Sequence, residues 1–163
     1  MDRRAFLKYL AKYLKMFECR IHACCLRDTH FHLLLENSAR TCLSEQMRRL
    51  ITAYTAHYNR RHNHHGHLFQ EHFKSLLVDK SGYFLTVSRY IHLNPARDCS
   101  PGKALGYPVS TLRHYADSGE PGFLETGGRA KYAQHVMEGL NDKTFPPVLQ
   151  QRHIGNMAFG RPL

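Results

Sequence analysis

His30-Phe31-His32-Leu33-Leu34-Leu35-Glu36 is the stretch around which the rest of the chain can be interpreted. The apolar run behind a His-x-His pair predicts a short buried strand. Side chains alternate along a strand, so His30 and His32 should share one face, and Phe31, Leu33 and Leu35 the other. Two imidazoles held side by side on a rigid element can bind one metal ion. The same pair also fits two partly exposed histidines on a strand edge, in a chain that holds 13 histidines.

The composition is that of one basic globular domain. The chain has 163 residues, enough for one core-forming domain with a short appendage, and a formal net charge of +10. Such an excess of Lys and Arg favours a polyanionic partner, although a basic protein without such a partner would have the same composition. No apolar window approaches the roughly 18 residues of a membrane span, and the N-terminus has no signal-peptide core. We therefore expect a cytoplasmic protein that does not bind membranes.

The cysteines indicate a reducing compartment. There are five, an odd number, and they form no CxxC pair: Cys19, Cys24, Cys25, Cys42 and Cys99. Reduced thiols in a cytosolic protein fit this pattern best. Because Cys24 and Cys25 lie in an apolar run, we expect them to be small core residues and not zinc ligands.

Hydrophobic periodicity and turn signals predict a mixed helix and strand protein. The expected helices cover residues 3–16, 43–61, 83–93 and 130–140, with a possible short helix at 110–115. The expected strands cover residues 18–26, 30–36 and 73–78, and the first two should form a hairpin. Asn94-Pro95 should stop the third long helix or fall in its last turn. We expect one domain at residues 1–115, followed at residues 116–163 by a linker, rich in Gly, Glu and Pro at 118–128, and a C-terminal helical appendage.

The strongest cationic cluster follows the second long helix. It reads Arg60-Arg61-His62-Asn63-His64-His65-Gly66-His67. A metal-binding tract is one interpretation, but an irregular loop with spread histidines better fits phosphate contact or plain solvation. Arg60, Arg61 and Lys74 are the candidate residues for contact with the phosphates of a polyanionic partner.

A second element with candidate site residues is the helix that contains Tyr90 and Asn94. The two residues are four apart and share a helix face. A hydroxyl nucleophile and an amide oxygen could both face a metal held by His30 and His32. Two imidazoles and one amide oxygen leave positions for phosphate oxygens and water, which suits Mg²⁺ or Mn²⁺. The alternative is that Tyr90 is a core aromatic residue and Asn94 a C-terminal cap.

Four blocks of sequence follow one another in a fixed order. They are His30 to Glu36, Ala53-Tyr54 with Tyr58-Asn59-Arg60-Arg61-His62, Gly66-His67-Leu68-Phe69-Gln70, and Arg89-Tyr90-Ile91-His92-Leu93-Asn94-Pro95. In this order and spacing they resemble the single-tyrosine transposases of the HUH nuclease superfamily, in the branch of the REP-associated tyrosine transposases. The resemblance runs from about residue 3 to 115.

The resemblance implies an α+β, ferredoxin-like fold, an antiparallel sheet with helices packed on one face. It also implies a metal-dependent enzyme in which His30 and His32 bind the metal, Asn94 is a third ligand, and Tyr90 attacks single-stranded DNA. The expected product is a 5′-phosphotyrosine link with a free 3′-OH. Relatives are homodimers that recognise imperfect hairpins beside the cleavage site, which suits a basic chain.

Two departures from the family pattern bear on activity. Relatives begin with a strand ahead of the first helix, whereas this chain starts at the helix, so we expect a sheet that lacks that strand and exposes backbone groups. The turn before His30 is Arg27-Asp28-Thr29, where relatives often have Met-Pro-Asn. A catalytically impaired transposase remnant that still binds hairpin DNA is therefore the alternative function.

Other hypotheses rank below these two. Relaxases and replication initiators use the same chemistry in longer chains, and a zinc-binding structural protein would rest on the histidine-rich loop alone. Tyr54 and Tyr58 compete with Tyr90 as nucleophiles, but both lie on the apolar stripe of a long helix, so we assign them to the core.

Overall fold

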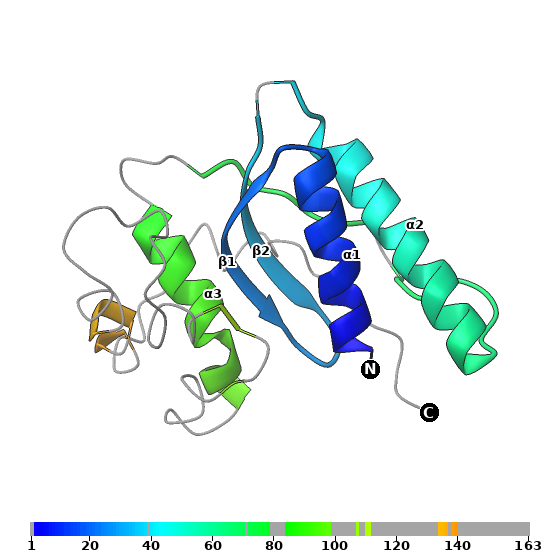
Figure 1. Cartoon of the computed structure of the whole chain (residues 1–163). Helices are drawn as coiled ribbons and strands as arrows, with labels where there is room; N and C mark the ends of the chain where they lie inside the picture. The colour runs from blue at the N-terminus through cyan, green and yellow to red at the C-terminus, as the bar shows by residue number, and fades with distance from the viewer. Residues whose placement is uncertain are drawn as a thin grey trace.

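The computed structural model describes residues 2–38, 40–70, 72–78, 84–98, 107, 110–111, 134–136 and 138–139. Its named elements are α1 (Arg3–Met16), β1 (Arg20–Leu26), β2 (Phe31–Glu36), α2 (Leu43–His62) and α3 (Phe84–Asp98). Figure 1 shows the two strands between α1 on one side and α3 on the other. The predicted α+β class is confirmed: in this part of the chain, an antiparallel two-stranded sheet has helices packed against it.

The sheet is a hairpin made by β1 and β2. Its register pairs Cys25 with His32 and Leu26 with Phe31. At the turn, the backbone N–H of Arg27 donates to the carbonyl of His30 at 2.8 Å. The first strand begins two residues later than predicted, after Glu18, which has a left-handed backbone with φ of 47°.

Thr111 covers the outer edge of β1. Its backbone N–H donates to the carbonyl of Cys24 at 3.0 Å, and the N–H of Cys24 donates to the Thr111 hydroxyl at 2.9 Å. Ser110 forms a bridge with Cys25 beside it. In an antiparallel ladder, two facing residues both point their backbone groups inward or both point them outward. The backbone N–H and C=O of Cys24 point away from β2, toward Thr111. Its ladder partner Leu33 therefore directs its own N–H and C=O away from β1.

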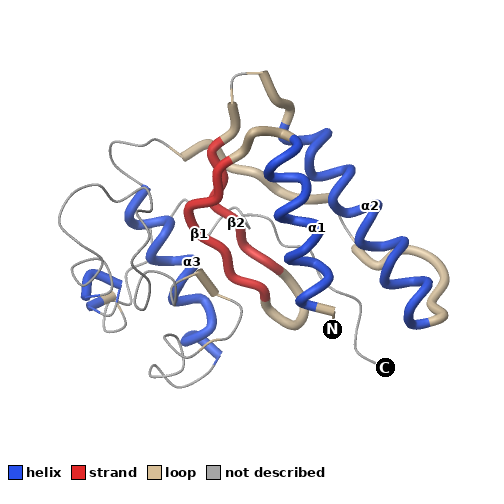
Figure 2. Tube along the Cα trace, viewed as in Figure 1, coloured by secondary structure: helices blue, strands red, loops and turns tan. Residues whose placement is uncertain are grey.

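Apolar side chains cover both faces of the sheet. α1 and α2 pack on the face that carries Leu26 and Phe31, while α3 packs on the face that carries Ala23, Cys25 and Leu34. Figure 2 shows the strands between these helices. The family resemblance implied that all helices pack on one face of the sheet. Instead, α1 and α2 lie together on one face, and α3 covers the opposite face.

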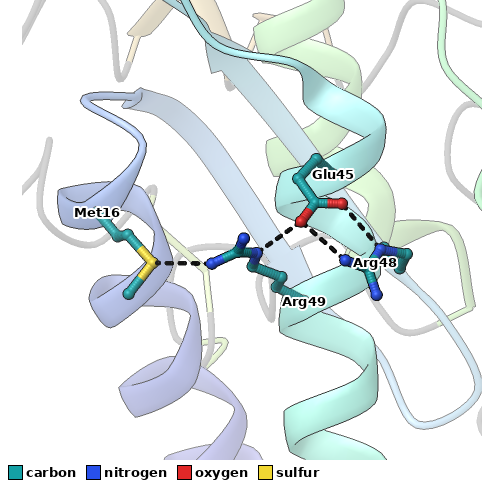
Figure 3. Close-up of polar contacts among 4 residues, drawn as sticks. All are labelled: Met16, Glu45, Arg48 and Arg49. Atoms are coloured by element: carbon teal, nitrogen blue, oxygen red, sulfur yellow. Dashed lines mark hydrogen bonds and ion pairs between the residues drawn. The ribbon is translucent and has the colours of Figure 1, made fainter.

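Charged residues join the neighbouring ends of α1 and α2. Glu45, in the first turn of α2, accepts hydrogen bonds from Arg48 at 2.8 Å and from Arg49 at 2.6 Å (Figure 3). Arg49 also reaches the sulfur of Met16 on α1, at 4.0 Å. The hydrogen bonds from the two guanidinium groups lower the pKa of Glu45 to about 2. A carboxylate here also suits the positive end of the helix dipole.

The prediction of a strand at residues 73–78 is wrong. No ladder joins this segment to a strand within the described residues. Phe73 packs in the layer of α1 and α2, whereas Leu76 and Val78 pack in the layer of α3. The segment passes from one layer to the other at the side of the sheet, and a cavity separates it from β2.

Three other predicted segments differ or fall outside the description. The helix expected at 83–93 runs on to Asp98, with Pro95 in its last turn. The short helix expected at 110–115 is wrong at its start, because Ser110 and Thr111 pair with β1. The linker at 118–128 lies outside the described residues, and residues 134–136 of the last expected helix are helical. The domain boundary at 115 remains a prediction.

Candidate active site

His30 and His32 lie at the turn end of the hairpin. His32 belongs to β2 and is 2% exposed, while His30 precedes the strand and is partly exposed. Their ring centroids are 4.9 Å apart, with the planes at 79°. The hydroxyl of Thr29 lies 3.1 Å from Nδ1 of His30. A group hydrogen-bonded to one ring nitrogen orients a histidine for metal binding through the other.

Tyr90 comes to this pair from α3. The strand alternation that buries Phe31 against α1 and α2 directs His32 to the opposite face, where Leu34 and Ile91 form the contact between β2 and α3. The Tyr90 ring centroid lies 5.8 Å from that of His32, and the planes meet at 82°. The hairpin and α3 thus bring together the two predicted histidines and the predicted nucleophile, although Tyr90 follows His32 by 58 residues in the sequence.

Asn94 lies one helical turn after Tyr90 and is 7% exposed. Its backbone carbonyl accepts a hydrogen bond from Nη1 of Arg27 at 2.7 Å. Arg27 stands directly after β1, so this contact fixes the C-terminal half of α3 against the turn that carries His30. The predicted third ligand and the predicted nucleophile thus both lie on α3.

The competing tyrosines lie elsewhere. Tyr54 is fully buried in the core, and its ring packs edge-on against Phe6 at 5.1 Å. Burial raises the pKa of its hydroxyl well above the usual range, which opposes the deprotonation that a nucleophile needs. Tyr58 stacks with His62 at 4.3 Å on the same helix. The assignment of Tyr54 to the core is confirmed, and Tyr90 is partly exposed on the other side of the sheet.

The donor set predicted from the sequence, two imidazoles and one amide oxygen, would suit a divalent ion that keeps positions open to its substrate. Within the described residues, no group of three His, Cys, Asp or Glu side chains could hold a metal by itself. Two imidazoles with one amide oxygen form an incomplete shell, and Mg²⁺ and Mn²⁺ ordinarily complete theirs with water and phosphate oxygens. A closed structural zinc site, which takes four protein ligands, does not match this set.

The candidate DNA-contacting residues do not gather at this centre. Arg60 and Arg61 end α2, on the face of the sheet opposite α3, and Lys74 is exposed in the segment beside β2. Arg61 forms an ion pair with Asp2 at 2.8 Å, next to the start of α1. A DNA strand that contacted Tyr90 and both arginines would have to wrap around the turn end of the hairpin.

The histidine-rich loop is organised by its own side chains. The amide nitrogen of Asn59 donates to the carbonyl of Gly66 at 3.0 Å, and its side-chain oxygen lies 3.0 Å from Nδ1 of His64. Asn63 ends α2 in a left-handed conformation with φ of 47°. These contacts favour a structured phosphate-contacting or solvated loop.

The predicted burial of the paired cysteines is confirmed. Cys24 and Cys25 are 3% and 0% exposed, and burial raises the pKa of each thiol to about 12. Neutral buried thiols do not bind zinc. The other cysteines in the described part of the chain, Cys19 and Cys42, are also free thiols.

Sequence reasoning missed two supports of the site. Arg27 was assigned only to a tight turn, although it bonds to the Asn94 carbonyl. His92 lies between the two site residues of α3, is fully buried, and places Nε2 2.9 Å from the hydroxyl of Thr111. The available signals were an arginine before the His-x-His pair and a histidine inside an apolar helix. Neither signal predicts which residue the side chain contacts.

One family of known proteins matches this chain. The profile of the family described as "Transposase IS200 like" matches residues 2–94, more than half of the chain. The comparison with curated proteins and the comparison with solved structures gave no match. The matched segment contains α1, both strands, α2 and the part of α3 that carries Tyr90 and Asn94. None of the helices in the described residues has the length and apolar character to span a membrane.

Proposed function

Because the chain belongs to the IS200-like transposase family, we propose that it cleaves and rejoins single-stranded DNA beside hairpins through a 5′-phosphotyrosine on Tyr90. The observation that carries the proposal is the convergence of His30, His32 and Tyr90, with successive ring centroids 4.9 and 5.8 Å apart. The resemblance of the four motif blocks to the single-tyrosine, REP-associated branch of the HUH superfamily supports this proposal.

Tyr90 is the nucleophile in this proposal. Its hydroxyl oxygen attacks the scissile phosphorus and loses its proton to solvent. The new bond joins Tyr90 to the 5′ side of the break, while the bond from phosphorus to the 3′ oxygen opens and that oxygen takes up a proton. Rejoining is the reverse: a 3′-OH attacks the phosphotyrosine and releases Tyr90.

His30 and His32 would hold a divalent cation, Mg²⁺ or Mn²⁺, with the amide oxygen of Asn94. When bound, such an ion would polarise the scissile phosphate and make its phosphorus more electrophilic, which helps a neutral phenol to attack. Arg27 keeps Asn94 in place through its backbone carbonyl. In this proposal Arg27 and Thr29 position the residues that would bind the metal.

The DNA partner follows from the charge of the chain. A net charge of +10 favours binding to phosphates, and Arg60, Arg61 and Lys74 are candidates to contact a hairpin stem. As in relatives, the active form would be a homodimer. Salt should weaken hairpin binding steeply, because each phosphate contact releases counterions.

A covalent-trapping assay tests the proposal. The protein is mixed with a labelled library of single-stranded hairpin DNAs and Mn²⁺ or Mg²⁺, then run on a denaturing gel. We expect a metal-dependent adduct that Tyr90→Phe and His30→Ala abolish and that Tyr58→Phe, the matched control on α2, retains. Hairpin retention without any adduct would instead identify a DNA-binding remnant of a transposase. An adduct that survives in Tyr90→Phe would overturn the assignment of the nucleophile.

A further inference from the structure

A row of exposed cations follows the outer side of α1. The row, called here the α1 cation row, consists of Arg4, Lys8, Lys12 and Lys15. Residues three and four positions apart are neighbours on a helix surface, so the four side chains share one face. With 3.6 residues per turn they fall within about 80° of arc. This arc lies opposite the side of the helix that is buried in the core, which carries Phe6, Leu10 and Tyr13.

No acidic residue of α1 offsets this charge. The helix contains no Asp or Glu between Arg3 and Met16. Within the described residues, no member of the row takes part in an ion pair, whereas four other arginines do: Arg3, Arg48, Arg49 and Arg61. Like charges one turn apart repel and destabilise a helix, and anions placed beside them remove that repulsion. The row therefore suits an anionic partner of similar length.

The neighbouring surface of α2 leaves space beside the row. At one end of this helical layer, Met16 of α1 contacts Arg49 of α2. At the other end, Asp2 pairs with Arg61, so the two helices are antiparallel. Between residues 50 and 59, all of which the structure describes, the exposed residues of α2 are small: Thr52 and Ala56. A rod-shaped partner can therefore approach the row without meeting long side chains from α2.

The length and position of the row fit the backbone of a DNA duplex. From Arg4 to Lys15 the helix rises about 16 Å. This length corresponds to about five successive phosphates of one strand of a duplex. The row also begins near the candidate active site, because Arg3 pairs with Asp28 in the turn that precedes His30. Figure 1 shows the start of α1 beside this turn of the hairpin.

We propose that the α1 cation row binds the phosphate backbone of a DNA stem, independently of the stem's base sequence. Since α1 and α3 lie on opposite faces of the sheet, the stem would lie away from Tyr90. A single strand that leaves the stem at the Arg4 end would pass the turn of the hairpin to reach Tyr90. Arg61, in contrast, is already paired with Asp2. The choice of DNA as the polyanion rests on the proposed function.

Fluorescence anisotropy with the purified full chain tests this proposal. The probes are two fluorescein-labelled DNA hairpins with unrelated stems of about 12 base pairs, which are longer than the row, and EDTA is present to prevent cleavage. The double variant Lys8→Gln/Lys12→Gln should weaken binding of both hairpins at least about tenfold at a salt concentration of about 0.1 M. The salt dependence of log K should become shallower by about two, since each phosphate contact contributes about one to this slope.

A second double variant matches the change in charge. Arg40→Gln/Arg48→Gln removes two positive charges from exposed positions outside the row. Arg48 is paired with Glu45 and lies on the side of α2 away from α1 (Figure 3). Affinity and salt slope should therefore stay close to those of the native chain. All four substituted positions are at the surface, so both variants should fold, which circular dichroism checks.

Four outcomes would overturn the proposal. Native affinity in Lys8→Gln/Lys12→Gln would show that the stem binds elsewhere. Equal loss in both double variants would show that net charge alone attracts the DNA. Loss of binding to one hairpin and not the other would indicate that bases are contacted. If the lysine variant loses binding to phosphatidylserine vesicles but keeps hairpin binding, the row is a membrane-binding surface.

The covalent-trapping assay separates this proposal from the proposed function. A native yield of adduct from Lys8→Gln/Lys12→Gln at subsaturating DNA would retain the nuclease and overturn the role of the row. Hairpin binding that depends on the two lysines, with no adduct formed by the native chain, would retain the row and overturn the nuclease.

Discussion

Lowering the pH should destabilise this protein through His92. The side chain is fully buried on α3, and burial lowers its pKa from the ordinary 6.5 to about 4. Between these two pH values the unfolded chain binds a proton at His92 and the folded chain does not. Stability contributed by the neutral imidazole is therefore complete above pH 6.5 and is lost as the pH falls toward 4.

The size of the effect follows from the pKa difference. One pKa unit corresponds to about 1.4 kcal/mol, so His92 should cost the folded state about 3 kcal/mol by pH 4. This is a large share of the total stability of a domain, which is typically about 5–15 kcal/mol.

Urea denaturation at pH 7.5 and pH 4.5, with a chelator present, measures this directly. His92→Gln removes the titration while keeping a side chain that can bond to Thr111. The free energy of unfolding of the native protein, relative to His92→Gln, should fall by about 2–3 kcal/mol between the two pH values. The exposed His67→Gln should follow the native protein. The same pH dependence in native protein and His92→Gln would refute the account of this histidine.

Three further substitutions have definite expected results. Leu50→Ala, at a core position with no exposed surface, should lower the free energy of unfolding by about 2–5 kcal/mol in urea, and Leu7→Ala, on the exposed side of α1, by much less. Thr111→Val should cost about 1–3 kcal/mol in the same measurement, since it removes the acceptor of the buried Cys24 N–H; no loss would mean that the edge of β1 is not held there. Arg27→Ala should lower the yield of covalent DNA adduct about tenfold while hairpin binding in a filter assay stays intact, and an unchanged yield would remove Arg27 from the site.

Local patterning was sufficient to predict the hairpin and its helices. The alternation in residues 30–36 determines which side chains face α3, because one face of the strand has to bury Phe31 against Phe6 and Tyr54. Helical spacing of apolar residues likewise predicted α1 and α2 to within two residues. These features depend on neighbours in sequence, which periodicity reports.

The rest depends on partners that are distant in sequence. Residues 73–78 have the composition of a strand, but a strand also needs a neighbour at hydrogen-bonding distance, and a groove lies there. Ser110 and Thr111 resemble a helix start, yet their hydrogen-bonding groups meet the edge of β1. The approach of Tyr90 to His32 was implied by family resemblance and not by spacing, because nothing local to α3 indicates which strand it packs on.

The most direct test of the central claim is to find which residue becomes bonded to DNA. Cleavage after Arg89 and Arg97 by trypsin gives the peptide 90–97, in which Tyr90 is the sole tyrosine, whereas Tyr54 and Tyr58 fall together in the peptide 50–60. The adduct formed with hairpin DNA and Mn²⁺ is digested with nuclease and trypsin, and the peptides are sequenced by mass spectrometry. The account predicts a nucleotide phosphate on Tyr90 in peptide 90–97. A phosphate-linked nucleotide in peptide 50–60, with peptide 90–97 unmodified, would contradict it.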